Sequence, residues 1–131
     1  MNYSYSDLTP PNTYEIAKRR TVMRLCRGII HKVEIQFPIG CAEVVHCHIN
    51  RGLHQVWPSN PEANYTSDGH VISFVESYEL LTPPYIMDVW TWNESENHNH
   101  KITVWISILP KRSLMHYILP EIGRIFSRGN K

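Results

Sequence analysis

The chain has 131 residues, of which 42% are hydrophobic and 19% are charged, and its net charge at neutral pH is +1. This composition is typical of a single folded domain with one hydrophobic core, and it excludes a chain that is disordered throughout. No apolar run approaches the roughly 18 residues of a membrane-spanning helix, so we expect no membrane span.

The first 27 residues carry a net charge of +3 and are predicted to form a basic N-terminal arm with the first strand or strands. Residues 3–12 are polar and contain Pro10-Pro11, which predicts an extended arm. Residues 14–26 have the composition of one or two strands, with the basic run Lys18-Arg19-Arg20 at a turn. The segment lacks the basic and apolar stretches of a secretory signal, so we expect no signal peptide.

Residues 28–110 carry a net charge of −6 and have the pattern of an antiparallel β-domain. Apolar and polar residues alternate in several short runs, and the clearest alternation extends from Ile102 to Ile108. Segments rich in turn-forming residues, such as 58–69, separate these runs. Six or so short strands without intervening helices predict an antiparallel β-sandwich or jelly-roll-like domain and argue against a parallel α/β fold.

Residues 111–131 carry a net charge of +4 and have a different pattern. Apolar residues recur at roughly helical spacing from Leu114 to Phe126, which predicts a short amphipathic helical tail that Pro120 interrupts. The apolar side of this tail packs on its own domain, docks on a neighbouring subunit or lies on a membrane surface. An acidic body between two basic ends favours self-association over catalysis.

Two histidines, His46 and His48, form the strongest chemical motif. Residues two apart in a strand point to the same face, so the two imidazoles could chelate a metal ion. Gly40, five further residues and then His46-x-His48 are similar to the first half of the first cupin motif. The glutamate of that motif is missing before Glu62, and the second cupin motif has no match. We therefore expect solvent-side histidines without metal or other cofactor, and a cupin-like metal-dependent enzyme stays an alternative.

Other signatures of catalysis are missing from the sequence. No nucleophile elbow, phosphate-binding loop or dinucleotide-binding motif occurs, so no catalytic residue is predicted. The three cysteines, Cys26, Cys41 and Cys47, are an odd number without CxxC spacing, which indicates free thiols and not a disulfide framework or a zinc ribbon.

The four tryptophans divide between core and surface. Trp90 and Trp92 lie on one face of a strand and are expected in the core. Trp105 lies opposite the apolar face of its strand, and Trp57 precedes a proline-containing loop, so both are expected at an interface. A sugar platform explains such exposed aromatic residues equally well, so a carbohydrate- or ligand-binding β-module stays an alternative.

The combination of an acidic, strand-rich body with two basic ends resembles small β-sandwich virion proteins, such as the capsid-decorating or tail-associated subunits of tailed viruses. The resemblance covers residues 28–110 and the style of both ends, and it rests on architecture and not on a sequence motif. It implies a non-enzymatic structural subunit of a virion that forms a homo-oligomer, often a trimer, and docks on a larger protein assembly. Direct contact of the basic ends with nucleic acid is not favoured. The residues expected at interfaces are Trp57, Trp105, Lys111, Arg112, Leu114, Ile118, Arg124, Ile125, Phe126 and Arg128.

Overall fold

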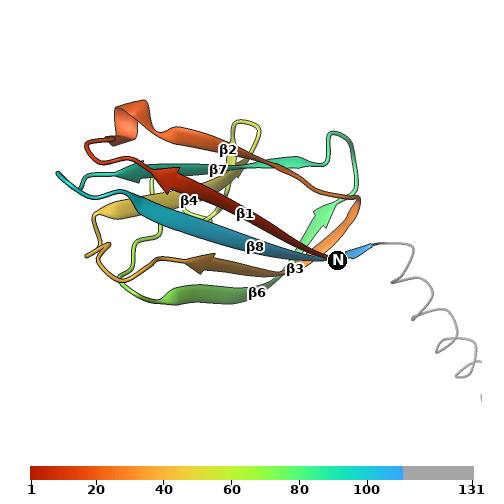
Figure 1. Ribbon diagram of the computed structural model, residues 1–131. Coiled ribbons are helices and arrows are strands. Elements are labelled where there is room, and N and C mark those ends of the chain that lie inside the picture. Colours follow the sequence, from red (N-terminus) through yellow and green to blue (C-terminus); the bar gives the residue numbers. More distant parts are fainter. Residues whose placement is uncertain (111–131) are drawn as a thin grey trace, which may run out of the picture.

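The computed structural model describes residues 1–110, which form eight β-strands and one short 3-10 helix. The strands pair into two antiparallel four-stranded sheets that face each other (Figure 1). The prediction of an antiparallel all-β fold is confirmed, since the described residues contain no α-helix. The elements are β1 (Asn2–Thr9), η1 (Glu15–Ala17), β2 (Arg19–Arg24), β3 (Gly28–Gln36), β4 (Val45–Arg51), β5 (His54–Trp57), β6 (Val71–Leu80), β7 (Ile86–Asn93) and β8 (His100–Pro110).

Sheet A has the strand order β1-β8-β3-β6, and sheet B has the order β2-β7-β4-β5. The pairing is nested, because the first strand pairs with the eighth, the second with the seventh, the third with the sixth and the fourth with the fifth. The connections between strands therefore gather at two opposite ends of the domain (Figure 1). The long-loop end has connections 10–18, 37–44, 58–70 and 94–99, and the short-loop end has 25–27, 52–53 and 81–85.

The core between the sheets is formed by side chains that alternate along the strands. In β8, the even-numbered residues from Ile102 to Ile108 are at most 1% exposed, which confirms the clearest pattern in the sequence. In β4, the odd-numbered residues from Val45 to Ile49 are fully buried. A bulge after Ile30 shifts the alternation of buried and exposed side chains within β3. The even-numbered Ile30 is therefore buried on the same side as the odd-numbered Val33 and Ile35. No helix within residues 1–110 has the length and hydropathy that a membrane crossing requires.

The N-terminal segment differs from the prediction. Most of the segment 3–12, predicted as an extended arm, belongs to β1, an edge strand of sheet A that pairs with β8 along its whole length. The Tyr5 hydroxyl donates to the carbonyl of Arg24, and Asp7 pairs with Arg19 at 2.9 Å, so β1 also contacts β2 of the other sheet. Arg19 begins β2 and does not lie in a turn. The segment is thus extended, but it is an integral part of the domain.

The predicted C-terminal tail, residues 111–131, lies outside the described residues. It follows Pro110, the last residue of β8. The amphipathic helix and the interface residues predicted for this segment stay predictions.

Candidate functional site

The outer face of sheet B carries a layer of imidazole and indole rings, of which two are buried and two are half-buried. In the register of β4 and β7, His46 lies opposite Trp92 and His48 lies opposite Trp90. The His46 ring stacks on Trp92 with centroids 5.0 Å apart, and the His48 ring stacks on Trp90 at 6.4 Å. His48 is only 5% exposed and Trp92 only 2%. The predicted solvent-side position of His48 is therefore wrong, and Trp92 is buried in this outer layer instead of the core between the sheets.

Lys18 covers this layer. It follows η1, which packs against β7, and its Nζ atom lies 3.0 Å from His48 Nε2 and 5.4 Å from the centroid of Trp90. An ammonium group can only donate, so His48 Nε2 accepts this hydrogen bond. The ring proton of His48 then lies on Nδ1, which donates to Asn50 Oδ1 at 2.8 Å. His48 is thus held as a neutral group between a donor and an acceptor.

The electrostatic environment agrees with a neutral His48. Burial lowers the pKa of this imidazole below its ordinary value, because the charged form loses its hydration. The Lys18 ammonium lowers the pKa further, whereas the hydrogen bond to Asn50 acts in the opposite direction. The result is a low pKa at a position that cannot easily accept a second positive charge.

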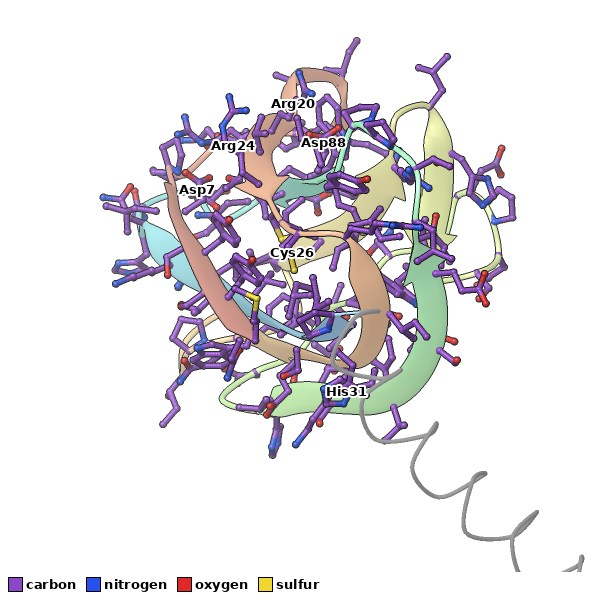
Figure 2. The ribbon with its side chains drawn as sticks, turned by 90° about the vertical axis from the view of Figure 1, so that its right-hand side faces the viewer. Asp7, Arg20, Arg24, Cys26, His31 and Asp88 are labelled. Carbon is purple, nitrogen blue, oxygen red and sulfur yellow. The ribbon has the colours of Figure 1, made fainter. Side chains whose placement is uncertain are left out.

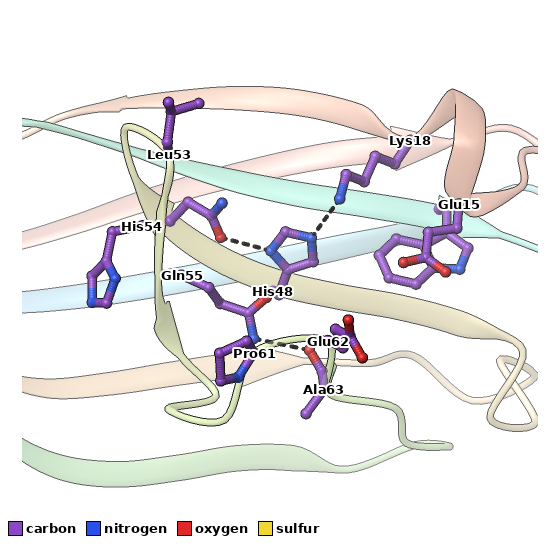
Figure 3. A pocket seen from close by; sticks show the side chains of 11 residues that line it. Glu15, Lys18, His48, Leu53, His54, Gln55, Pro61, Glu62 and Ala63 are labelled. Carbon is purple, nitrogen blue, oxygen red and sulfur yellow. Dashed lines mark hydrogen bonds between the residues drawn. The ribbon is translucent and has the colours of Figure 1, made fainter.

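A pocket of about 370 Å³ opens beside Lys18 (Figure 3). It is bounded by η1, by the β4–β5 hairpin and by the loop after β5. Gln55 fixes this loop, because its side-chain amide donates to backbone carbonyls within residues 58–63. The carboxylates of Glu15 and Glu62 face the same space as the lysine. A cavity of this size with mixed charge suits a small polar ligand better than an apolar one.

The two histidines do not share a set of metal ligands. His46 Nδ1 lies 2.7 Å from Asn64 Oδ1, and its Nε2 lies 3.6 Å from a carboxylate oxygen of Glu94. Both ring nitrogens of His48 are engaged in hydrogen bonds. In the part of the chain that the structure describes, no three or more His, Cys, Asp or Glu side chains come close enough to hold a metal ion.

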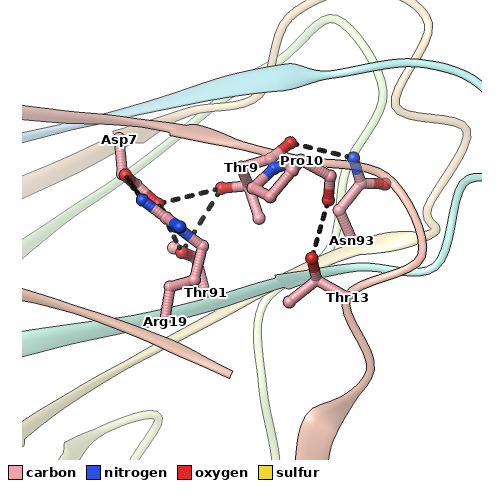
Figure 4. A network of polar contacts seen from close by, with 7 residues as sticks. All are labelled: Asp7, Thr9, Pro10, Thr13, Arg19, Thr91 and Asn93. Atoms are coloured by element: carbon pink, nitrogen blue, oxygen red, sulfur yellow. Dashed lines mark hydrogen bonds and ion pairs between the residues drawn. The ribbon is translucent and has the colours of Figure 1, made fainter. Parts of the chain in front are cut away.

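A second polar group joins the two sheets at the long-loop end (Figure 4). Asp7 of β1 accepts hydrogen bonds from Arg19 Nε of β2 at 2.9 Å and from the Thr91 hydroxyl of β7 at 3.3 Å. Burial raises the pKa of the Asp7 carboxyl, but the hydrogen bond and charge of Arg19, together with hydrogen bonds from Thr91 and Thr9, outweigh it. The pKa therefore lies below its ordinary value. This network serves to fasten β1 onto sheet B.

No family model matches this chain, and no curated protein or solved structure matches it either. The function is therefore inferred from the geometry of the residues themselves.

Trp57, which the sequence places at an interface, lies in the core. It is 3% exposed, and its ring packs against Phe74 and Tyr78 of β6 with centroids 5.9 Å and 5.5 Å away. Its Nε1 donates to a carboxylate oxygen of Glu76 at 3.0 Å. The expectation of an exposed Trp57 is thereby corrected, because the short strand β5 turns this side chain inward between the sheets.

Trp105, the other tryptophan predicted at an interface, lies on the outer face of sheet A. It stands opposite Ser4 of β1 and Glu34 of β3 and is partly exposed. The remaining eight predicted interface residues belong to residues 111–131, outside the described part. The structure therefore does not bring the predicted interface residues together, and it adds the layer around His48, which the sequence pattern places in solvent.

The low pKa of His48 predicts how the stability of the protein depends on pH. The pKa is lower in the folded protein than the ordinary value of about 6.5, so the unfolded chain takes up the proton first as the pH falls. We expect the full free energy of unfolding above about pH 6.5 and a decrease as the pH falls toward the folded-state pKa. Burial lowers the pKa of His100 as well, which adds to the same trend. Urea denaturation at about pH 7.5 and pH 5.5 measures the difference.

The variant His48→Gln isolates the contribution of this residue. Its loss of stability between the two pH values should be smaller than that of the wild type, because the titrating group is gone. The matched variant His54→Gln changes an exposed histidine and should keep the full pH dependence. An identical pH dependence in His48→Gln and wild type would contradict the assignment.

Proposed function

We propose that this protein is a non-enzymatic assembly subunit with a jelly-roll fold, of the kind that builds or decorates a virion. The observation that carries this proposal is the nested strand order, with β1-β8-β3-β6 in one sheet and β2-β7-β4-β5 in the other. A long hairpin folded over onto itself gives this order. Eight-stranded jelly rolls of two such sheets are used by viral capsid proteins, and also by lectins and cupins.

The contacts of the histidines favour an assembly subunit over a cupin-like enzyme. His46 and His48 stack on tryptophans and bond to asparagine and lysine side chains. These contacts make the rings part of a packed layer. An imidazole that serves as a metal ligand needs a free nitrogen directed at a shared centre. Nε2 of His46 neither accepts nor donates a hydrogen bond, but both nitrogens of His48 are engaged, and no cluster of three or more potential ligands forms within residues 1–110.

Sheet A offers surfaces on which a neighbouring subunit can pack. Strand β6 is ten residues long, lies at the edge of the sheet and has exposed outward side chains, with Val75 at 83%. A long edge strand leaves backbone N–H and C=O groups that a neighbour can pair with. Trp105 is partly exposed on the face of the same sheet, and aromatic residues are enriched in protein interfaces. These features support association through surfaces of the folded domain.

The full chain is expected to form a homo-oligomer of defined size, with a trimer as the leading expectation. Light scattering coupled to size-exclusion chromatography, over a broad range of protein concentrations, measures its mass. Electron microscopy of purified particles then tests whether the oligomer is part of a larger assembly. A chain that stays monomeric at every concentration and joins no larger particle would rule out the assembly role.

The pocket beside Lys18 supports a second candidate function, a carbohydrate- or ligand-binding module. Its volume of about 370 Å³ and its mixture of carboxylates, amide and ammonium groups match a small polar ligand. Trp92 lines the same pocket, so its fluorescence is expected to report an occupant. Titration with simple sugars, monitored by tryptophan fluorescence in wild type and in Trp92→Phe, distinguishes this candidate from the first.

A further inference from the structure

The two ends of the domain carry opposite charge. At the long-loop end, the four connections and the strand residues beside them hold six carboxylates against Lys18 and Arg19, a net charge of −4. At the short-loop end, the equivalent positions hold three arginines and no carboxylate, a net charge of +3. The carboxylates are Glu15, Glu43, Glu62, Asp68, Glu94 and Glu96, and the arginines are Arg24, Arg27 and Arg51.

Most of these charges are free to meet a partner. Among residues 1–110, none of the six carboxylates pairs with a lysine or arginine, and none of the three arginines pairs with a carboxylate. Glu94 lies 3.6 Å from Nε2 of His46. Figure 2 looks onto the short-loop end and shows Arg24 above Cys26 on the face toward the viewer. Arg24 and Arg27 are exposed. Arg51 donates to the carbonyl of Thr82, which holds its guanidinium at this end without neutralising it.

The separation of the two ends prevents them from neutralising each other. Strands β3, β6 and β8 have nine, ten and eleven residues, and a strand rises about 3.3 Å per residue, so the ends lie roughly 30 Å apart. The Debye length at physiological ionic strength is about 8 Å. Each end therefore presents its own charge to the surroundings.

The long-loop end also exposes apolar side chains where a partner can dock. Ile16 is 99% exposed, Ile39 is 88% exposed and Leu8 is 57% exposed. Leu8 and Ile39 line a hollow of about 510 Å³ together with residues 98–101. Exposed apolar side chains surrounded by charged groups have the anatomy of an interface, in which an apolar centre is enclosed by a polar rim.

We propose that two copies of this chain associate head to tail, with the acidic long-loop end of one copy against the basic short-loop end of the next. The inference rests on the proposed assembly function and specifies its interface. Charge complementarity selects a second copy as the occupant of the long-loop end, because the same chain carries the matching positive surface. Association through two identical ends would place like charges together, which costs several kcal/mol.

A head-to-tail contact is heterologous, since each copy contributes two different surfaces. Such contacts generate a closed ring when the rotation between copies closes, and a filament when it does not. The head-to-tail contact is consistent with a ring of three or more copies and with a tube of stacked copies. Opposite charge also orients two copies before they touch, which raises the rate of association and makes it sensitive to salt.

Charge reversal at each end tests the proposal in the full chain. The long-loop variant Glu43→Lys with Glu96→Lys makes the long-loop end neutral, and the short-loop variant Arg24→Glu with Arg27→Glu makes both ends acidic. Each variant alone should self-associate at least about tenfold more weakly than wild type. In an equimolar mixture, the unaltered acidic end of the short-loop variant meets the unaltered basic end of the long-loop variant, so association should return. Sedimentation velocity at about 0.05 M and about 0.5 M salt measures these masses, and higher salt should weaken the mixture.

A control variant separates the charge of the long-loop end from the identity of its side chains. Glu43→Asp with Glu96→Asp alters the same two positions as the long-loop variant but keeps both negative charges. It should associate like wild type. Oligomers that form equally well in all variants would overturn the head-to-tail interface and leave the assembly function standing. A wild-type chain that is monomeric in both salts would overturn both.

Discussion

Replacement of Trp57 by alanine is expected to lower the free energy of unfolding by about 3–5 kcal/mol, the usual cost of removing a large aromatic side chain from a core. The ring fills the space between the sheets, where it packs on Phe74 and Tyr78. Its removal leaves a cavity and takes the Nε1 donor away from the Glu76 carboxylate. Urea denaturation followed by far-ultraviolet circular dichroism measures the loss.

Trp105→Ala is the matched control for this experiment. It removes the same side chain from the outer face of sheet A, where the indole is partly exposed, so the loss of stability should be clearly smaller. If Trp105 lies at a subunit interface, the variant should weaken oligomers while the monomer stays folded. Equal destabilisation by the two substitutions would contradict the assignment of Trp57 to the core and Trp105 to the surface.

The different fates of these two tryptophans show what the sequence pattern determines. The alternation in β8 extends over many residues, so the outward direction of Trp105 could be predicted from it. Strand β5 has only four residues and pairs with β4 across an irregular register. A run of four residues before a proline is too short to show which side chains point toward the core. The inward direction of Trp57 depends on its packing against β6, which the local sequence does not indicate.

The N-terminal strand was missed for a related reason. Its composition is polar and prolines follow it, which are features of an arm. Tyr3 and Tyr5 nevertheless alternate with exposed serines in the pattern of a half-buried strand. The contacts that hold it, such as the ion pair between Asp7 and Arg19, join residues that no local pattern relates.

The buried layer on sheet B could not be predicted from periodicity alone. Alternation correctly separates His46 and His48 from the core residues of β4, and it therefore places them in solvent. The structure instead covers His48 with Lys18, which reaches over the sheet from the end of η1, whereas His46 stays half-buried. Burial here results from a contact between residues 30 positions apart, and such a contact has no signature in a single sequence.

Replacement of Asn93 by leucine is expected to destabilise the protein by about 2–5 kcal/mol, because one buried and two partly buried backbone groups lose their partner. A buried group left without a partner costs about 1–3 kcal/mol, and a partly buried one costs less. Asn93 is fully buried at the end of β7. Its Nδ2 donates to the carbonyls of Thr9 and His98, and its Oδ1 accepts from the backbone N–H of Ser95 (Figure 4 shows the bond to Thr9). One side chain thus joins β1, β7 and the last connection at the long-loop end.

Asn93→Asp separates the hydrogen bonds from the shape of the side chain. Aspartate keeps the acceptor for Ser95 but loses both donors, and it places a carboxylate against the carbonyls of Thr9 and His98. The variant should be strongly destabilised at neutral pH and should recover in part as the pH falls, because a protonated carboxyl can donate again to one carbonyl. Asn99→Leu changes an exposed residue of the same connection and should change the free energy of unfolding by no more than about 0.5 kcal/mol. Denaturation of the three variants at about pH 7 and pH 4.5 measures these effects. If the stability of Asn93→Asp relative to wild type does not improve at the lower pH, the lost donors are not the cause of its destabilisation.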